Sequence, residues 1–215
     1  MKPLIIIGAG GFGREVAWLI ERINQKSQTW DILGFIDDSP EKHGCVLNGY
    51  PVLGGLDNVK DFRHAHFVCA VGNASVRKEI IQKVRDLVPD ACFATLIDPS
   101  VIMSSSVSIG EGSIVCAGSI LTVNINIGSQ VHINLDCTVG HDCVLGDFTT
   151  LYPSVNLSGG VNIGCMTELG TGSQILQYKT IGSGSIVAAG SVVINDIPDK
   201  CMAAGVPALP KKFYK

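Results

Sequence analysis

The chain between Ile97 and Pro198 repeats with a period of six residues, and this repeat limits the possible folds more than any other feature of the sequence. The segment divides into 17 consecutive hexads without an insertion or a deletion, and every hexad begins with isoleucine, leucine, valine or methionine. A fixed short period of this kind is typical of a parallel β-helix, in which each hexad supplies one short strand and one corner. We therefore expect an all-β helix of hexapeptide repeats.

The fifth residue of the hexads is also restricted. It is Ser, Thr, Cys or Val in 14 of the 17 hexads, and the exceptions are Ile125, Lys179 and Ile197. Because each repeat buries its apolar side against its neighbours, an aliphatic first position and a small fifth position suit the narrow interior of such a helix. We expect both positions to face inward.

The N-terminal part of the chain alternates between short apolar runs and segments with helical spacing. These predict strands at 3–8, 32–36 and 67–71 and helices at 14–24 and 76–87. The alternation is typical of an α/β domain with a small Rossmann-like parallel sheet and crossover helices.

The two patterns together predict the domain organisation. A solenoid needs a cap at each end, and the α/β domain can cap one of them. We expect the α/β domain at 1–96, the β-helix at 97–198 and a C-terminal capping tail at 199–215.

The α/β domain carries a glycine-rich loop. Residues Gly8 to Gly13 satisfy G-x-G-x-x-G between a predicted strand and a predicted helix, and Asp37 ends the next strand. Glycine amides at a helix N-terminus bind phosphate or diphosphate groups. A domain of roughly 95 residues is too small for both halves of a dinucleotide-binding fold, so a nucleotide-sugar diphosphate is the preferred ligand. A dinucleotide and a purely structural turn remain alternatives.

One histidine in the hexads is a candidate catalytic base. His141 occupies the third position of its hexad, near a corner, and Asp142 follows it. Neighbouring residues on a strand point to opposite faces, so these side chains can meet only if the corner bends the chain. A carboxylate beside an imidazole would fix its tautomer and give a general base. An exposed surface histidine is the alternative.

Composition excludes several classes of function. The formal net charge is −3, which gives no basic field for nucleic acid. No apolar stretch is long enough for a membrane span, and no signal peptide is evident. The eight cysteines show neither C-x-x-C pairs nor metal-finger spacing, so we expect a reducing cytoplasm.

Several segments in combination resemble a known family. GAGGFGRE near the start, GFIDDSP, AVGN, VGHDCVLGDF within the hexads and AAGVPA near the end are similar to the NeuD/PglD-type sugar O- and N-acyltransferases. The resemblance implies a left-handed β-helix with three hexads per turn. It also implies a homotrimer with acetyl-CoA in a groove between neighbouring helices, and it assigns the catalytic base to His141 and its acidic partner to Asp142.

The resemblance assigns further site residues. Asn134 is a second polar group of the catalytic site. The cofactor positions are Thr150, Gly159, Thr171 and Ala189, and the sugar-nucleotide positions are Gly10, Gly11, Phe12, Asp37, Asp38 and Gly72. Two positions depart from the family, since many relatives have histidine where this chain has Phe12, and Thr150 replaces a histidine that contacts the cofactor.

These observations predict an enzyme that moves an acetyl group from acetyl-CoA to the amino group of a nucleotide-linked 4-amino-sugar, with UDP as the expected nucleotide, for bacterial surface glycan synthesis. No metal is expected. O-acetylation of a sialic acid-like sugar is the alternative reaction. A structural or zinc-binding hexapeptide protein and an NAD-binding regulator are the alternatives of other classes.

Overall fold

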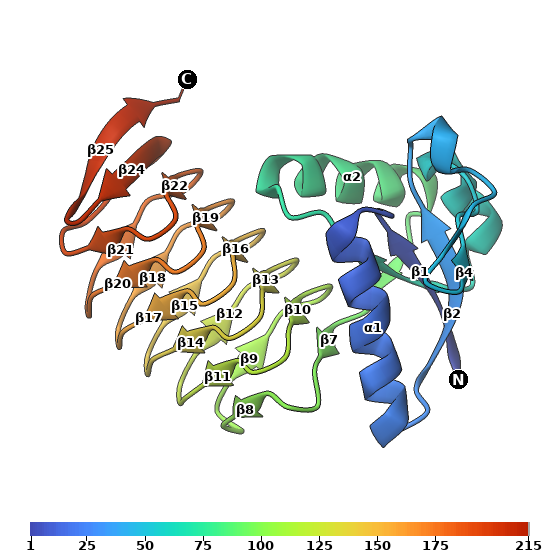
Figure 1. The fold of residues 1–215 in the computed structure, drawn as a ribbon, viewed down its shortest axis with the longest axis horizontal. Helices are drawn as coiled ribbons and strands as arrows, with labels where there is room; N and C mark the ends of the chain where they lie inside the picture. The colour runs from blue at the N-terminus through green and yellow to red at the C-terminus, as the bar shows by residue number, and fades with distance from the viewer. Residues whose placement is uncertain (215) are drawn as a thin grey trace. The chain divides into compact units, whose positions relative to one another are not determined.

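The computed structural model describes residues 1–214, and the chain divides into two compact units (Figure 1). The N-terminal unit is Met1–Pro99, and the solenoid unit begins at Ser100. This division lies three residues after the boundary expected from the hexads. None of the helices among the described residues is long and apolar enough to cross a membrane.

The N-terminal unit contains a four-stranded parallel sheet in the order β2-β1-β5-β6. The strands are β1 (Lys2–Ile7), β2 (Trp30–Ile36), β5 (His66–Cys69) and β6 (Cys92–Phe93). The helices are α1 (Gly11–Lys26) and α2 (Ala74–Leu87), and β7 (Leu96–Ile97) ends the unit. The predicted parallel sheet with crossover helices is confirmed. The sequence missed β6, because a two-residue strand has no periodic signal.

The connection between β2 and β5 is more ordered than its turn-rich sequence indicates. It contains two 3₁₀ helices, η1 (Pro40–Lys42) and η2 (Leu56–Phe62). Between them β3 (Val46–Leu47) and β4 (Tyr50–Pro51) form an antiparallel pair. This connection starts at the carboxyl end of β2 and supplies part of the pocket described below.

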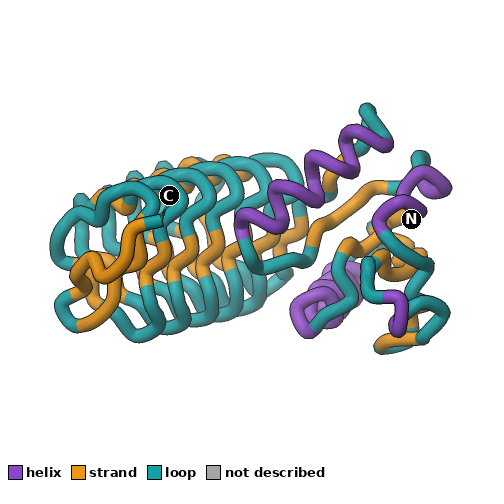
Figure 2. Tube along the Cα trace, turned by 90° about the horizontal axis from the view of Figure 1, so that it is seen from above, coloured by secondary structure: helices purple, strands orange, loops and turns teal. Residues whose placement is uncertain are grey.

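The solenoid unit consists of short strands stacked in three parallel sheets (Figure 2). Residues paired on adjacent strands are 18 positions apart, as in Ile120↔Thr138, so one coil takes three hexads. The first sheet contains β10 (Ile114–Val115), β13 (His132–Ile133), β16 (Thr150–Leu151), β19 (Glu168–Leu169) and β22 (Ile186–Val187). The second contains β8 (Ile102–Met103), β11 (Ile120–Leu121), β14 (Thr138–Val139), β17 (Asn156–Leu157), β20 (Gln174–Ile175) and β23 (Val192–Val193). The third contains β9 (Ser108–Ile109), β12 (Asn126–Ile127), β15 (Val144–Leu145), β18 (Asn162–Ile163) and β21 (Thr180–Ile181).

The interior of the solenoid is built from the two positions that the sequence predicts. From Val115 to Val193, the first residue of each hexad is at most 4% exposed. The serines and threonines at the fifth position are buried as well, and most of them donate hydrogen bonds to backbone carbonyls, as Ser119 Oγ does to the Asn134 oxygen at 3.0 Å. These bonds allow a hydroxyl inside an apolar core, because a buried polar group is costly only when it lacks a partner.

The corners depend on the fourth position, which the sequence analysis did not single out. From Gly112 to Gly190, residues there have a left-handed backbone, with φ of 55° at Asn124, 60° at Asp142 and 59° at Tyr178. Glycine, asparagine and aspartate tolerate this conformation best, and they hold many of the fourth positions. The left-handed residue turns the chain from one sheet to the next.

The last coil departs from the hexad frame. Ile181 forms a bridge with Ile197 and Ile186 pairs with Met202, so the spacing is 16 residues instead of 18. The Asp196 carboxylate accepts a hydrogen bond from the Thr180 amide at 2.9 Å. In the coil before, the equivalent amide of Asn162 donates to the backbone carbonyl of Lys179. The uninterrupted frame predicted to Pro198 is therefore wrong in its final hexad. Ile197 is a large residue at a fifth position because it pairs with Ile181, which is the first residue of its hexad.

The C-terminal residues continue the first sheet. After the short coil, β24 (Cys201–Gly205) pairs in parallel with β22, and β25 (Ala208–Phe213) pairs with β24 in antiparallel orientation. Lys215, the last residue of the predicted capping tail, lies outside the described residues. We propose that this hairpin is the C-terminal cap of the solenoid.

The packing predicts different costs for two neighbouring residues of β18. Ile163 is 1% exposed inside the solenoid, whereas Asn162 beside it is exposed. Ile163→Ala should lower the free energy of unfolding by about 2–5 kcal/mol because it leaves a cavity. Asn162→Ala should change it by less than about 0.5 kcal/mol. Urea unfolding followed by circular dichroism measures both, and equal losses would contradict the inward assignment.

Candidate functional site

The corner between β14 and β15 brings His141 and Asp142 together. The left-handed backbone of Asp142 bends the chain there, and His141 Nδ1 lies 2.8 Å from Asp142 Oδ2. The side chains are 53% and 59% exposed, so both are accessible from solvent. The bend required for their contact is therefore present.

The electrostatics of the pair favour one form of the imidazole. The hydrogen bond from His141, followed by one from Asn124, holds the pKa of Asp142 below its ordinary value. An ionised Asp142 accepts a hydrogen bond from Nδ1–H, which leaves Nε2 with its lone pair. The pair can therefore act as a general base through Nε2.

The adjacent coil leaves room for the His141 ring. Gly159 lies against Nε2, and a methyl group added to Gly159 would overlap the imidazole. The Gly160 amide donates to the His141 carbonyl at 2.7 Å, which holds the two coils together at this corner. The Tyr178 ring lies across Gly160 and is 72% exposed. The sequence analysis did not identify Tyr178.

The other predicted residues of the solenoid lie elsewhere on the coils. Asn134, Thr171 and Ala189 belong to the corners between the first and second sheets, and Thr150 is buried on β16. Asn134 Oδ1 accepts a hydrogen bond from the Leu135 amide at 2.7 Å. Within one chain, the structure thus groups His141, Asp142 and Gly159 at one corner and separates Asn134, Thr171 and Ala189 from them.

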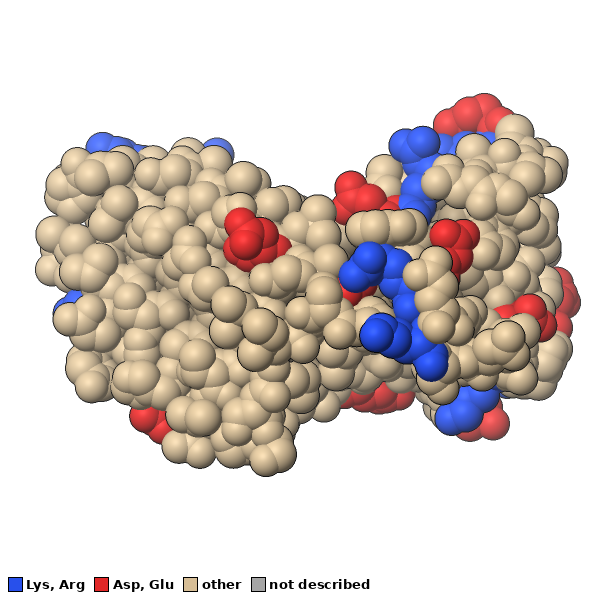
Figure 3. Space-filling view, turned by 60° about the horizontal axis from the view of Figure 1, so that its bottom comes forward, with Lys and Arg blue, Asp and Glu red and all other residues tan. Residues whose placement is uncertain are grey.

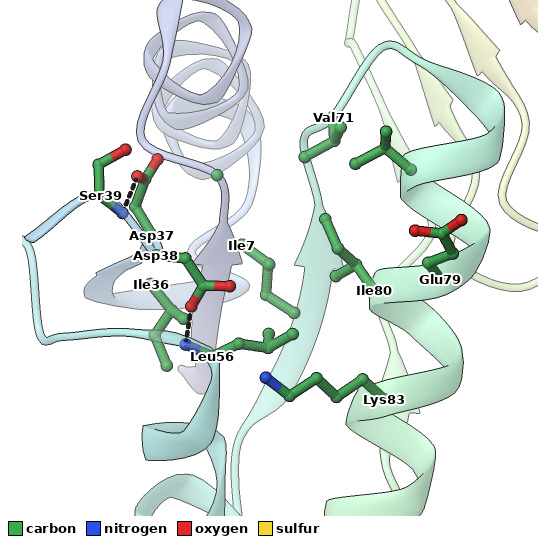
Figure 4. A pocket seen from close by; sticks show the side chains of 12 residues that line it. Ile7, Ile36, Asp37, Asp38, Ser39, Leu56, Val71, Glu79, Ile80 and Lys83 are labelled. Atoms are coloured by element: carbon green, nitrogen blue, oxygen red, sulfur yellow. Dashed lines mark hydrogen bonds between the residues drawn. The ribbon is translucent and has the colours of Figure 1, made fainter.

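The N-terminal unit contains a cavity of about 550 Å³ at the carboxyl ends of β1 and β2 and beside α2 (Figure 4). Ligands of open parallel sheets bind at this edge, where the chain order reverses between neighbouring strands. In this sheet the reversal lies between β1 and β5. The cavity is lined by Ile7, Gly8, Ile36, Asp37, Asp38, Ser39, Leu56, Val71, Val76, Glu79, Ile80 and Lys83.

Asp37 anchors the loops around this cavity. Its carboxylate accepts hydrogen bonds from the amides of Ala9 at 2.8 Å and Ser39 at 3.0 Å, and Lys42 Nζ lies 3.1 Å from both oxygens. Burial by itself would raise the pKa of Asp37, but these donors lower it to about 2. Asp37 therefore lines the cavity as a carboxylate that already has protein donors.

Asp38 has a different environment. Its Oδ1 accepts a hydrogen bond from the Leu56 amide at 2.6 Å, and the side chain lies at the cavity (Figure 4). Glu79 and Lys83 line the cavity from α2. The sequence analysis did not identify these two residues, because only the fold places this face of α2 beside the end of β2.

The glycine loop leads into α1 as the sequence predicts. Gly13 has no room for a side chain, since a methyl group there would overlap the Gly8 carbonyl. Gly10 and Gly11 face open space, and no side chain caps the N-terminus of the helix. Phe12 is half-buried in the first turn. The partial positive charge of this helix end is therefore available to an anion.

Gly72 follows β5 and takes part in a buried contact. The guanidinium of Arg77, which is fully buried, donates to the carbonyls of Val71 at 2.7 Å and Gly72 at 2.9 Å. This arginine was not identified from the sequence, because only the fold brings its guanidinium to the turn after β5. The contact fixes the turn that leads from β5 into α2.

Charged side chains are sparse on the solenoid. Between Ser100 and Pro198 the sequence has one basic residue, Lys179, and the face in Figure 3 shows few charged groups on this unit. In residues 1–214 no group of three or more His, Cys, Asp or Glu side chains is arranged to hold a metal ion.

Comparisons with known proteins match both units. Residues 3–84 match the family model described as the PglD N-terminal domain. A UDP-N-acetylbacillosamine N-acetyltransferase of Bacillus subtilis is 37% identical over 121 residues, which are 54% of this chain and 52% of that protein. The match thus spans about half the length of this curated relative.

Solved structures match over nearly the whole chain. PerB from Caulobacter crescentus, in complex with CoA and GDP-perosamine, is 32% identical with a TM-score of 0.88, and the match covers 99% of this chain and 98% of that one. The acetyltransferase domain of PglB from Neisseria gonorrhoeae is 34% identical with a TM-score of 0.88, and the match covers 98% and 100%.

The Asp37 network predicts a pH-dependent contribution to stability. Because the folded-state pKa is depressed, the stabilisation is present above about pH 4 and is lost as the pH falls toward about 2. Asp37→Asn should cost on the order of 1 kcal/mol at pH 7, after allowance for solvent screening, and progressively less below pH 4. Asp31→Asn, an exposed position on β2 with the same change in charge, is the control. A cost for Asp37→Asn that does not change with pH would contradict the network.

Proposed function

Since the chain belongs to the PglD-like family of sugar acyltransferases, we propose that it transfers the acetyl group of acetyl-CoA to the amino group of a nucleotide-linked 4-amino-sugar. The observation that carries this proposal is the contact between His141 and Asp142 at a solvent-accessible corner, where His141 Nε2 lies beside Gly159. The complexes of relatives support the substrates, since PerB was solved with CoA and GDP-perosamine and the PglB domain with acetyl coenzyme A.

The N-terminal unit is proposed to hold the nucleotide. The cavity beside Asp38 offers apolar walls from Ile36, Leu56 and Ile80 for a base. The uncapped N-terminus of α1 at Gly10 and Gly11 suits a diphosphate, because backbone amides and the helix dipole both favour negative charge. Asp37 and Gly72 contribute by holding these loops, and Phe12 lies beside the diphosphate position in the first turn of α1. The preference for UDP over GDP stays a prediction.

The chemistry is proposed to take place at His141. Its Nε2 removes a proton from the sugar amine as the amine nitrogen forms a bond to the thioester carbonyl carbon. The carbon–sulfur bond then breaks, and the CoA sulfur leaves as a thiolate that takes up a proton. Asp142 stabilises the imidazolium through Nδ1–H. Gly159 keeps the space beside Nε2 free of side-chain atoms.

The separation of the predicted residues supports a site formed by two chains. His141 and Gly159 lie at one corner of the solenoid, whereas Asn134, Thr171 and Ala189 lie at another. A site that uses both sets needs one corner from each of two subunits, as in a ring of identical chains. A surface with few charges suits such an interface. We therefore propose a homotrimer with acetyl-CoA between subunits, where Thr171 and Ala189 line the groove, whereas Thr150, which is buried in the single chain, does not.

The eight cysteines are free and form no disulfide in the described chain. Disulfides are rare in reducing compartments. This usage supports the cytoplasm as the compartment of the enzyme.

The central test is loss of activity in His141→Ala. A positioned base contributes about 10²–10⁴-fold, so CoA release with a nucleotide-4-amino-sugar should fall on that scale. The oligomer should stay intact on gel filtration, because His141 is exposed and fills no part of the core. His64→Ala, at an exposed position of the N-terminal unit, is the control and should keep full activity. A near-normal rate for His141→Ala would remove His141 from the mechanism.

Mixing inactive variants tests the shared site. His141→Ala and Asn134→Ala chains, each inactive as a homo-oligomer, should regain activity when they are unfolded together and reassembled. About a quarter of all sites after random 1:1 reassembly, or one site in each mixed trimer, would then combine an intact His141 with an intact Asn134 from another chain. Each variant treated alone is the control. No recovery in verified mixed oligomers would contradict a site formed by two subunits.

A further inference from the structure

A third side chain contacts the catalytic pair from the adjacent coil. Asn124 lies 18 residues before Asp142, and its Nδ2 donates a hydrogen bond to Asp142 Oδ1 at 3.2 Å. The other carboxylate oxygen, Oδ2, meets His141 Nδ1 at 2.8 Å. Both oxygens of the carboxylate are therefore engaged, each by a different residue.

Asn124 is itself fixed by its corner. Its backbone is left-handed, with φ of 55°, and its backbone N–H donates a hydrogen bond to Ser106 Oγ at 2.9 Å. The Asp142 amide in turn donates to the Val123 carbonyl at 3.1 Å. The relative position of Asn124 and Asp142 is thus set by the backbone ladder between the two coils.

We propose that Asn124 is a positioning residue that holds the Asp142 carboxylate in the plane that orients His141. The inference rests on the proposed function of His141. An exposed carboxylate with one anchor can rotate about its terminal bond, whereas two hydrogen bonds fix its orientation. A fixed acceptor at Nδ1 keeps the proton on that nitrogen and leaves Nε2 as the proton acceptor.

Few groups near His141 could orient its imidazole. Asp142 lies on its own coil, Asn124 on the coil before, and Gly159 and Gly160 on the coil after. Tyr178, one coil further, lies across Gly160. Cys143 points into the solenoid and is fully buried. Among the described residues, Asp142 is the charged group whose side chain contacts the His141 imidazole.

Another corner of the solenoid provides a matched control. Asp136 also has a left-handed backbone, and its Oδ2 accepts a hydrogen bond from Ser154 Oγ in the adjacent coil at 3.2 Å. The residue before Asp136 is Leu135, so this corner has the same kind of bond without a histidine. Ser154→Gly removes that bond and leaves the His141 corner unchanged.

Two variants of Asn124 separate its amide from its backbone. Asn124→Gly removes the side chain and tolerates the left-handed conformation, and Asn124→Asp keeps the shape but replaces the donor with a second carboxylate that repels Asp142. We expect both to lower kcat by about 3–10-fold, the effect of losing one hydrogen bond, with the KM for acetyl-CoA unchanged. His64→Ala, which lies outside both corners of the proposed site, should leave kcat unchanged, and Ser154→Gly serves as the control for the tautomer.

The tautomer of His141 gives a readout that does not depend on activity. In protein labelled with ¹⁵N-histidine, the His141 signals are identified by their absence from His141→Ala. The wild type and Ser154→Gly should carry the proton on Nδ1, and this form should decrease in Asn124→Gly and Asn124→Asp. A structural defect alone would lower the thermal midpoint without this change.

The outcomes distinguish the two proposals. A wild-type rate and tautomer in both Asn124 variants, with His141→Ala inactive, would overturn the positioning role and leave the proposed function intact. Activity in His141→Ala would overturn the proposed function. The tautomer spectra of the Asn124 variants would still decide whether Asn124 orients His141 through Asp142.

Discussion

The left-handed backbone at the fourth position of the hexads is the constraint on which the rest of the solenoid depends. It allows a strand of two residues to end, turn and join the next sheet within six residues, and it stacks these turns 18 residues apart. The same bend places consecutive side chains on one side of the chain, which a straight strand cannot do. The contact between His141 and Asp142 therefore has the same origin as the fold, since the turn that closes the coil also forms the pair.

Much of the fold could be predicted because its pattern is local. The aliphatic first residue and the small fifth residue are visible in the sequence, and both are buried as expected from Val115 onward. The short last coil could not be predicted, because the six-residue pattern continues in the sequence. In the structure Ile197 pairs with Ile181, 16 residues earlier, where the other coils have a spacing of 18. The fourth position had a signal in its glycines, asparagines and aspartates. That signal was masked by bulky residues such as Tyr178, which take the same conformation in the stacked coils.

The site could be predicted where one segment contains it. His141 and Asp142 are neighbours in the sequence, and the glycine loop is continuous with α1, so both could be identified from their residues. Asn124, Lys83 and Arg77 could not, since each acts on residues that only the coil spacing or the sheet order brings near. For Asp37 the sequence predicted the position but not the partners. Its type and place suggested a ligand contact, yet the structure engages its carboxylate with Ala9, Ser39 and Lys42.

In the proposed reaction the N-terminal unit recognises the nucleotide, and one corner of the solenoid transfers the proton. The reaction requires the acceptor amine to reach His141. A crystal structure of the protein with CoA and a nucleotide-4-amino-sugar tests this most directly. We expect the amine nitrogen of the sugar to lie within hydrogen-bond distance of His141 Nε2, at about 2.6–3.2 Å. An amine bound away from His141, with the CoA sulfur beside a different group, would contradict it.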